Sequence, residues 1–457
     1  MPAPQRHAVV VIGAGLAGLH AALQLQARGI DVKVIEGQDR VGGRVHSMRQ
    51  RGSTKEAGGT YIGAGYTRVI GAAATHGVEL IDVTPVLAFY REQALVLGRE
   101  IIHQAEWPAH PANPFPERDR KLMPWAYHRV LTARECPLES PGDWLDPQHL
   151  QHDVSLRDWM RGLRLSDAAI AMGYGLNVSF GDSAADVSAL LMFFRAAFSI
   201  AQRKLAPPGI VGYTAKDGVQ RIPEAMAAAL DTEVALEKIV TAIAAQRDQL
   251  HIHCADGSEY LARDVICTLP FSVLRTIKID PPLTGALAQA VTSLPYQPMT
   301  QIYLAHKSEF WNDDGYAPSL YTDGVLGMIS AARNGEDPDE VTSFTAWAMG
   351  PNARYLDTLP KAQAGRLAIA ELEALRPAAK GQLEFVDLHS WGTDPFARGG
   401  WAYFQPGQIA EFGANMGAAH GSLRFCGEHL ARTSRGMEGA MESAEHVVAE
   451  LLEAYSI

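Results

Sequence analysis

The hydrophobic positions near the start of the chain predict a strand, a helix and a second strand in close succession. Residues 8–12 (AVVVI) form a short, β-branched apolar run, which is typical of a strand buried in a parallel sheet. Residues 19–29 (LHAALQLQARG) carry the small and apolar side chains of a buried helix, and residues 32–36 (VKVIE) form the second strand. This order of elements indicates an α/β protein with parallel strands.

The middle of the chain changes character twice. Residues 80–205 contain many prolines and tryptophans, followed by helical stretches at 155–163 and 186–202. The sequence PPG at 207–209 predicts the end of that helical region, because proline cannot continue a helix. Residues 299–349 are rich in strand formers, which predicts a sheet that faces the substrate.

The last segment of the chain predicts a strand, a loop and a long helix. The apolar positions of that helix recur at three- and four-residue steps, so one face is expected to be buried. These positions are Ala440, Met441, Ala444, Val447, Val448, Leu451, Leu452 and Tyr455.

The composition indicates a soluble globular protein of two or three domains. The 457 residues are 47% hydrophobic and 20% charged, which is a balance that builds a sizeable core. The net charge of −11 argues against a nucleic-acid partner, because phosphate binding needs a basic surface. No secretory signal is recognisable, and no apolar run approaches the ~20 residues of a membrane span, so no membrane association is expected and the expected location is the cytoplasm.

Cysteine and histidine add little to the candidate chemistry. The four cysteines are scattered, which indicates a reduced interior. The sixteen histidines show no ligand spacing such as HExxH. No metal site is therefore expected.

Three glycines between the first strand and the helix form a dinucleotide-binding motif. Gly13 permits the tight turn, Gly15 lets the backbone approach a pyrophosphate, and Gly18 lets the helix pack closely on the strand. The helix N-terminus would then face the phosphates with its partial positive charge. Glu36 lies 23 residues after Gly13, at the end of the second strand, where its carboxylate can accept a ribose hydroxyl. These features predict a site for FAD or NAD.

The residues that follow distinguish FAD from NAD. Gly43 and Arg44, in DRVGGRVHS, bring a cation near the same pyrophosphate, where an NAD domain would usually continue into another helix. The segment KEAGGTYIGAG then offers backbone that can lie against a flat ring. Its candidate cofactor-binding residues are Gly58, Gly59, Thr60 and Tyr61. This segment resembles the flavin-containing amine oxidase family, which includes monoamine oxidases, polyamine oxidases and L-amino-acid oxidases.

The resemblance extends to the C-terminal motif FCGEHLARTSRGMEGAMES. By this match Glu428, after Gly427, lies near the ribityl–phosphate region, and the backbone at Met437 meets the isoalloxazine. A helix that begins there with its N-terminus aimed at the flavin would stabilise negative charge on the reduced ring. Val240 matches a family position whose backbone meets the adenine.

The stretch HSWGTDPFARGGWAYFQPGQ is similar to the family segment that brings an aromatic residue to the substrate side of the flavin. By this match Trp391 would pack against the flavin, and Trp401 would form a wall of the substrate site. Family members with a covalently attached flavin carry a cysteine in this stretch. Here Gly399 and Gly400 precede Trp401, so FAD is expected to be non-covalent.

Two positions depart from the family pattern. Many members place a second aromatic residue just before the MEG motif, where this chain has Gly436 after Arg435. The aromatic cage is therefore incomplete, and Arg435 could instead face an anionic or polar substrate.

The family lysine that holds a water beside flavin N5 corresponds to Gln301, which brings no positive charge. Oxygen and another electron acceptor therefore both stay open.

These features predict a two-domain FAD-dependent oxidoreductase of the α/β class. A Rossmann-like FAD domain would be assembled from residues 1–80, 205–285 and 395–457, and a substrate domain of mixed sheet and helices from 81–204 and 286–394. The predicted reaction is hydride transfer from a small amine to flavin N5, followed by hydrolysis of the imine. Three alternatives stay open: a dehydrogenase with a non-oxygen acceptor, an L-amino-acid oxidase and a non-catalytic flavoprotein. The oligomeric state also stays open, a homodimer included.

Overall fold

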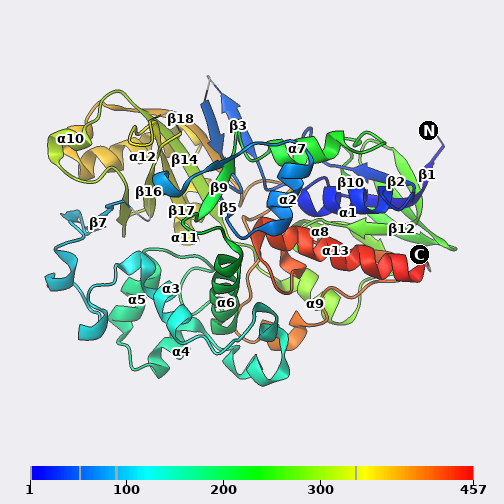
Figure 1. Ribbon diagram of the computed structural model, residues 1–457, viewed down its shortest axis with the longest axis horizontal. Helices are drawn as coiled ribbons and strands as arrows, with labels where there is room; N and C mark the ends of the chain where they lie inside the picture. The colour runs from blue at the N-terminus through cyan, green and yellow to red at the C-terminus, as the bar shows by residue number, and fades with distance from the viewer. Residues whose placement is uncertain (1–2, 51–52, 88–90, 335–336, 456–457) are drawn as a thin grey trace.

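Two seven-stranded sheets form the framework of the protein, and Figure 1 shows them on opposite sides of the molecule. The computed structural model describes residues 3–50, 53–87, 91–334 and 337–455. The first sheet has the order β13-β10-β11-β12-β1-β2, and β19 pairs with β12. Its strands are β1 (Gln5–Ile12), β2 (Val32–Ile35), β10 (Val240–Gln246), β11 (Gln249–Cys254), β12 (Glu259–Cys267), β13 (Lys278–Asp280) and β19 (Leu423–Phe425).

The parallel part of this sheet brings four chain segments to one edge. β1 is parallel to β2 and to β12, with Ile12 opposite both Ile35 and Cys267. β19 is parallel to β12, with Phe425 opposite Cys267. The carboxyl ends of β2, β1, β12 and β19 therefore lie side by side, which is where ligands bind in open parallel sheets.

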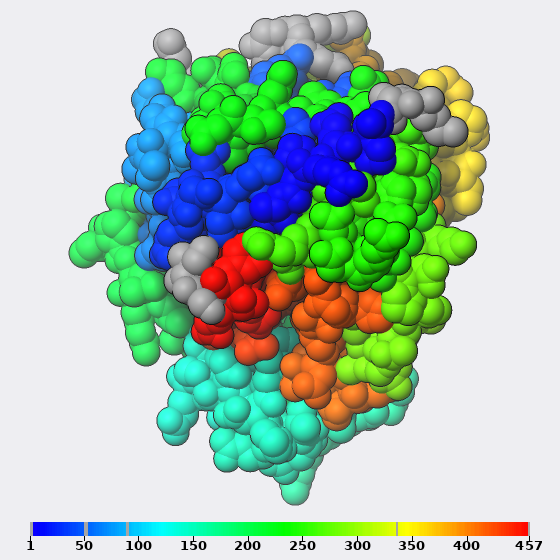
Figure 2. Space-filling view, turned by 90° about the vertical axis from the view of Figure 1, so that its right-hand side faces the viewer, coloured from blue at the N-terminus to red at the C-terminus, as the bar shows by residue number. Residues whose placement is uncertain are grey.

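Two long helices from opposite ends of the chain cover one face of the first sheet. α1 (Leu16–Gln26) and α13 (Gly436–Ala454) pack against each other and against β1. The predicted apolar stripe of α13 is largely confirmed, because Met441, Ala444, Val447, Val448, Leu451 and Leu452 are buried. Figure 2 shows the end of this helix (red) on the same face as the first residues of the chain (blue).

The second sheet is mostly antiparallel and has the order β18-β14-β17-β16-β15-β7-β8. Its strands are β7 (Ala94–Leu97), β8 (Glu100–Ile102), β14 (Met299–His306), β15 (Leu320–Thr322), β16 (Met328–Ala332), β17 (Ser343–Met349) and β18 (Leu383–Ser390). The strands predicted between 299 and 349 are confirmed, with a short α10 (Trp311–Asp314) between β14 and β15.

The two faces of β14 serve different neighbours, because successive side chains of a strand point to opposite sides. On one face Ile302 and Leu304 pack in the cluster beneath α11 (Pro351–Asp357) and α12 (Lys361–Leu375). On the other face the Tyr303 hydroxyl donates to the Glu56 carbonyl, 3.2 Å away. β14 therefore presents its second face, with Met299 and Gln301, to the N-terminal segment.

A group of helices completes the molecule below the second sheet in Figure 1. It comprises α3 (Pro124–Arg134), α4 (Leu156–Gly162), α5 (Asp167–Gly175) and α6 (Ala189–Leu205). The predicted helix end before PPG is confirmed, since α6 stops at Leu205.

The other α-helices are α2 (Thr67–Thr75), α7 (Arg221–Ala228), α8 (Phe271–Leu274) and α9 (Gly285–Ser293). Two small sheets complete the strands: the pair β3 (Ser47–Gln50) and β4 (Ser53–Glu56), and the sheet of β5 (Ile62–Gly63), β9 (Gly212–Ala215) and β6 (Leu80–Asp82).

The predicted α/β class is confirmed by these mixed sheets and their covering helices. Within the described ranges, no helix is both long enough and apolar enough to cross a membrane.

Candidate active site

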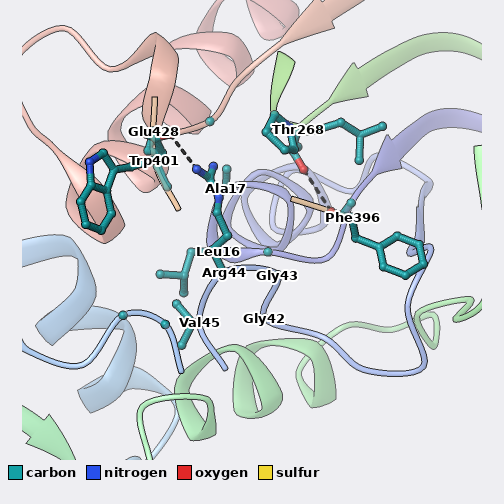
Figure 3. A pocket seen from close by; sticks show the side chains of 18 of the residues that line it. Leu16, Ala17, Gly42, Gly43, Arg44, Val45, Thr268, Phe396, Trp401 and Glu428 are labelled. Atoms are coloured by element: carbon teal, nitrogen blue, oxygen red, sulfur yellow. Dashed lines mark hydrogen bonds and ion pairs between the residues drawn. The ribbon is translucent and has the colours of Figure 1, made fainter. Parts of the chain in front are cut away.

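A cavity of about 640 Å³ lies where the two sheets meet, and residues from the beginning, middle and end of the chain line it. Figure 3 shows part of its lining. Sixteen of the residues singled out from the sequence line this cavity: Gly13, Gly15, Glu36, Gly43, Arg44, Gly58, Gly59, Thr60, Tyr61, Val240, Trp391, Trp401, Gly427, Glu428, Gly436 and Met437. The glycine-rich and acidic segments thus converge on one site.

The turn between β1 and α1 is as tight as the three glycines predict. Gly13 has a positive φ of 106°, and a Cβ at this position would lie 2.4 Å from Thr268 Oγ1. Gly18 does not line the cavity, but a Cβ there would lie 1.9 Å from the Gly13 carbonyl oxygen. Gly15 is the N-cap of α1 and offers no side-chain cap, so the first N–H groups of this helix are free to face an anion.

Glu36 stands at the carboxyl end of β2 and is 7% exposed. Its carboxylate accepts hydrogen bonds from the Ala14 N–H at 2.7 Å and from the Gln38 N–H at 2.9 Å. Burial raises the pKa of Glu36, and these backbone hydrogen bonds oppose the shift. The side chain is therefore held in place at the cavity wall.

Arg44 and Glu428 form an ion pair across the cavity wall, with 2.7 Å between Nη1 and Oε1 (Figure 3). Arg44 also donates to the Gly400 carbonyl at 3.2 Å, and the same Glu428 oxygen accepts from the Ala402 N–H at 3.0 Å. Burial would raise the pKa of Glu428, but the charge of Arg44 and these hydrogen bonds outweigh it and hold the pKa below its ordinary value. The pair is therefore charged.

Two tryptophan rings are fixed at the other end of the cavity by hydrogen bonds to backbone. The Trp391 indole donates from Nε1 to the Ala57 carbonyl at 2.5 Å, and its side chain is almost completely buried. The Trp401 indole donates to the Ser179 carbonyl at 3.0 Å, and its ring meets Phe180 edge to face, 6.4 Å between centroids. Both rings are thereby oriented before any ligand binds.

The start of α13 faces the same end of the cavity. The helix begins at Gly436, and its N-cap residue Arg435 makes no side-chain capping bond. A Cβ at Gly59 would lie 2.9 Å from the sulfur of Met437, so the Gly59 loop and the helix start touch. A second helix N-terminus with unsatisfied N–H groups therefore points at the cavity.

Gln301 and Arg435 are not among the described residues that line the cavity. Gln301 is fully buried, accepts a hydrogen bond from the Tyr303 hydroxyl at 3.0 Å, and pairs across β14 and β17 with Trp347, which lines the cavity. Its Nε2 has no hydrogen-bond partner among the described residues. Arg435 is partly exposed, with its guanidinium carbon 5.0 Å from the centre of the Phe180 ring.

The cavity also contains residues that sequence reasoning missed. These include Tyr66, Arg195, Lys238, Thr268, Met299, Trp347 and Phe396. For Arg195 a signal was present, because it is a lone charge in the apolar helical run LLMFFRAAF. Trp347 and Met299 lie on strands whose orientation depends on sheet packing, and their sequence carries no comparable signal.

One group of side chains outside the cavity could hold a metal ion. His251 and His253 on β11 and Glu259 on β12 have ligand atoms within 4.8 Å of one another. The two histidines are two residues apart on a strand, so this group does not follow the helical HExxH pattern.

Comparison with known proteins agrees with this arrangement. Residues 16–452 match the family described as flavin containing amine oxidoreductase. A Mycobacterium tuberculosis protein, AofH, named as a proposed flavin-containing monoamine oxidase, is 28% identical over 97% of this chain and 96% of its own length. Human amine oxidase [flavin-containing] B is 24% identical over 98% of this chain and 86% of its own.

Two solved structures share the fold. Putrescine oxidase bound to putrescine has a TM-score of 0.76 at 23% identity and covers 99% of this chain and 100% of its own. Cyclohexylamine oxidase from Brevibacterium oxydans has a TM-score of 0.79 at 21% identity, with the same coverage. Since the family match spans nearly the whole chain and the family's motifs meet at one cavity, this protein belongs to the flavin-containing amine oxidoreductases and is an enzyme of that family.

Proposed function

We propose that this enzyme binds FAD without a covalent bond and oxidises the carbon–nitrogen bond of a small amine. The convergence of glycine-rich, acidic and aromatic segments on one cavity carries this proposal. FAD, when bound, would supply the acceptor that takes a hydride from the carbon bearing the nitrogen. The amine thereby becomes an imine, which water hydrolyses to a carbonyl compound and ammonia or a smaller amine.

The residues at the sheet edge fit the charged half of FAD. The open N-terminus of α1 and the Arg44 guanidinium provide positive potential for a pyrophosphate, and Gly15 and Gly43 leave room for it. Glu36 keeps carboxylate lone pairs for a ribose hydroxyl, and Val240 lies at the same end of the cavity for the adenine. Gly58, Gly59, Thr60, Tyr61, Gly427 and Met437 would surround the remaining parts of the cofactor.

The aromatic end of the cavity suits the flavin ring and the amine. We infer that Trp391 packs against the ring and that Trp401 forms a substrate wall, because both rings line the cavity and are held by backbone hydrogen bonds. A rigid aromatic wall orients the reacting carbon without a loss of freedom at the moment of reaction. The neutral amine is the reactive form, so excluding water at this wall also favours it.

The non-covalent attachment rests on the residues around Trp401. Gly399 and Gly400 stand where a tethered relative would carry a cysteine, and no cysteine is among the described residues that line the cavity. We also propose that residues 1–80, 205–285 and 395–457 form the FAD domain. The first sheet supports this division, since each of its strands falls inside those ranges.

A second reading concerns the electron acceptor. Gln301 brings no charge to the place where related enzymes have a lysine, which favours a dehydrogenase whose acceptor is not oxygen. An L-amino-acid oxidase is favoured by the cation of Arg435 near the substrate wall.

The test is anaerobic mixing of the purified yellow enzyme with a panel of amines. Loss of visible flavin absorbance is expected with at least one amine and with no alcohol of the same carbon skeleton. Acid precipitation should release free FAD into the supernatant, whereas a tethered flavin would stay in the pellet. An enzyme that takes up FAD but is reduced by no amine contradicts the proposed reaction.

A further inference from the structure

Arg195 places an unpaired positive charge in the wall of the cavity. It lies in the middle of α6 between the buried residues Phe193, Phe194, Ala196 and Ala197. Within the described ranges its side chain makes no ion pair and no hydrogen bond with another residue. Withdrawing a charge from water is costly unless a partner compensates, so a structural role alone leaves this arginine unexplained.

Two further arginines stand close to Arg195 and also lack an acidic partner in the described part of the chain. Arg435 lies over Phe180 and Phe194, with its guanidinium carbon 5.0 Å and 5.9 Å from the two ring centres. Arg129 comes from α3, and its buried Nε has no hydrogen-bond partner there. We call Arg129, Arg195 and Arg435 the arginine cluster.

The arginine cluster is electrostatically unsatisfied. Burial lowers the pKa of Arg195 most, and the positive charges of Arg129 and then Arg435 lower it further. The hydroxyls of Tyr66 and Tyr174, which also face Arg195, are neutral, because burial raises the pKa of both. Guanidinium groups stay protonated even so, and like charges gathered at the wall of a cavity create a positive potential inside it.

The nearby carboxylates do not neutralise this potential. Glu428 acts on Arg435 at a distance, but its oxygen is engaged by Arg44 at 2.7 Å and by the Ala402 N–H. Glu438 is paired with Arg68 at 3.2 Å. Among the described residues, no carboxylate therefore compensates Arg195, and a bound anion would supply the missing negative charge.

We propose that the amine oxidised by this enzyme is an amino dicarboxylate, whose carboxylates are held by Arg195 in the cavity wall and by the positive potential of Arg129 and Arg435 beside it. This inference rests on the proposed amine oxidation and adds the substrate class to it. In its reactive form, with a neutral amine, such a substrate carries two negative charges opposite three positive ones. Planar guanidinium forks match carboxylates in bidentate geometry, which favours carboxylates over other anions.

The position of the cluster suits a substrate that reaches the tryptophan wall. Phe180 contacts both Trp401 and Arg435, so this arginine stands beside the wall proposed to orient the reacting carbon. Arg195 lines the cavity, and Arg129 stands beside it on the neighbouring helix. A cationic diamine such as putrescine, which is bound in one structure of similar fold, would be repelled by the same charges.

The first experiment compares rates of anaerobic flavin reduction by matched compounds. Glutamate, norvaline and butylamine differ by the successive loss of carboxylates, and aspartate and 2-aminoadipate vary the spacing between the two. The quantity compared is the rate of flavin reduction divided by the dissociation constant of the substrate. For the best dicarboxylate this ratio should be about tenfold or more higher than for its monocarboxylate analogue, and the difference from the plain amine should be larger still. Equal or faster reduction by butylamine or putrescine overturns the proposal while leaving amine oxidation intact. Reduction by none of the compounds counts against the proposed function itself.

The second experiment measures binding without turnover. It tests whether a dicarboxylate binds the arginine cluster itself or responds only to the overall charge of the protein. Glutarate binding to the oxidised enzyme is followed by calorimetry and by the shift of the visible flavin spectrum. Arg195→Gln should weaken glutarate binding about tenfold or more with unchanged FAD content. Arg203→Gln is the matched control, because Arg203 lies on the same helix but is exposed and should leave binding unchanged. Arg195→Lys should recover part of the affinity, and equal binding by all four proteins overturns the proposal.

Discussion

Arg44 and Glu428 lie 384 residues apart in the sequence and form an ion pair 2.7 Å long in the wall of the cavity. Through the Gly400 carbonyl and the Ala402 N–H the pair also fastens the segment that carries Trp401. Three distant segments therefore depend on one interaction, and the shape of the proposed flavin site depends on it as well.

Glu428→Gln should weaken the enzyme both as a fold and as a flavoprotein. The substitution keeps a hydrogen-bonding side chain but leaves the Arg44 charge uncompensated, which should cost about 1–3 kcal/mol of unfolding free energy. The melting temperature should fall and recover partly when free FAD is added, as thermal unfolding at several FAD concentrations would measure. Glu224→Gln is the control, since its pair with Arg49 is more exposed and should cost under about 1 kcal/mol. Equal losses in the two variants would contradict a special role for the cavity pair.

Gly18→Ala should disrupt the approach of α1 to the turn that precedes it. The added Cβ would lie 1.9 Å from the Gly13 carbonyl oxygen and 3.2 Å from Val11 Cγ1, so helix or turn must move. We expect a loss of about 1–3 kcal/mol or more in urea unfolding, together with lower FAD content after purification. Gly71→Ala on α2 is the opposite case, because a Cβ there meets nothing within 4 Å. It should stabilise the protein by about 0.5–1 kcal/mol, and a destabilising effect there would show that the geometric argument fails.

The first βαβ unit and the last helix could be predicted from the sequence because local rules determine them. The turn at Gly13 needs a positive φ, and the close approach at Gly18 excludes any side chain. The buried face of α13 follows from helical periodicity alone, with Met441 and Val448 as examples. These signals lie within single segments, so no knowledge of tertiary packing was required.

The aromatic end of the cavity could not be predicted in the same way. Met299 and Trp347 line it because β14 pairs with β17 in one register, and that pairing joins residues far apart in sequence. Gln301 shares their sheet face but is fully buried and is not among the described lining residues, a distinction that alignment to a family motif does not resolve. Arg195 was visible as an odd charge in an apolar helix, but only the fold brings Arg129 and Arg435 beside it.

The stability of the enzyme should fall on mild acidification, and His429 should cause part of that fall. His429 is 4% exposed, and neither ring nitrogen has a hydrogen-bond partner among the described residues. The ring packs against Phe271, with 4.4 Å between the two ring centres. Burial is the first cause that lowers the pKa of His429, from 6.5 to about 4. Because the unfolded chain then binds more protons, stability is full above pH 6.5 and is lost as pH falls toward 4, by up to about 3 kcal/mol.

His429→Gln removes this contribution, so its unfolding free energy should change less between pH 7 and pH 4.5 than that of the natural enzyme. Urea unfolding at half-unit pH steps would measure the difference in slope. His446→Gln provides the comparison for the loss of a histidine, because His446 is an exposed residue of α13. Parallel slopes in all three proteins would show that folding does not lower the pKa of His429.

Glu56 should act in the opposite direction over an overlapping range. Burial raises its pKa to about 7, against hydrogen bonds donated by Val219 N and the Ser47 hydroxyl. The folded chain then holds a proton that the unfolded chain releases, so this carboxyl lowers stability as pH rises from 4.5 to 7. Glu56→Gln should therefore gain stability relative to the natural enzyme at pH 7.5 but not at pH 4.5. A gain of the same size at both values would assign the effect to packing instead of titration.

Replacing Gln301 should change how fast the reduced enzyme reacts with oxygen. Its side chain is uncharged and fully buried, with Nε2 free of any described partner and Oε1 bound to the Tyr303 hydroxyl. A cation near the reduced ring would stabilise the negative charge that develops as oxygen accepts electrons, and the Gln301 side chain supplies none. Gln301→Lys should therefore raise the reoxidation rate by about tenfold or more, measured by stopped-flow mixing of the reduced enzyme with aerated buffer. Gln301→Met removes the polar group without adding charge and should stay within about twofold of the natural enzyme. If the natural enzyme already reoxidises as fast as Gln301→Lys, oxygen is a competent acceptor without that charge and the dehydrogenase reading is wrong.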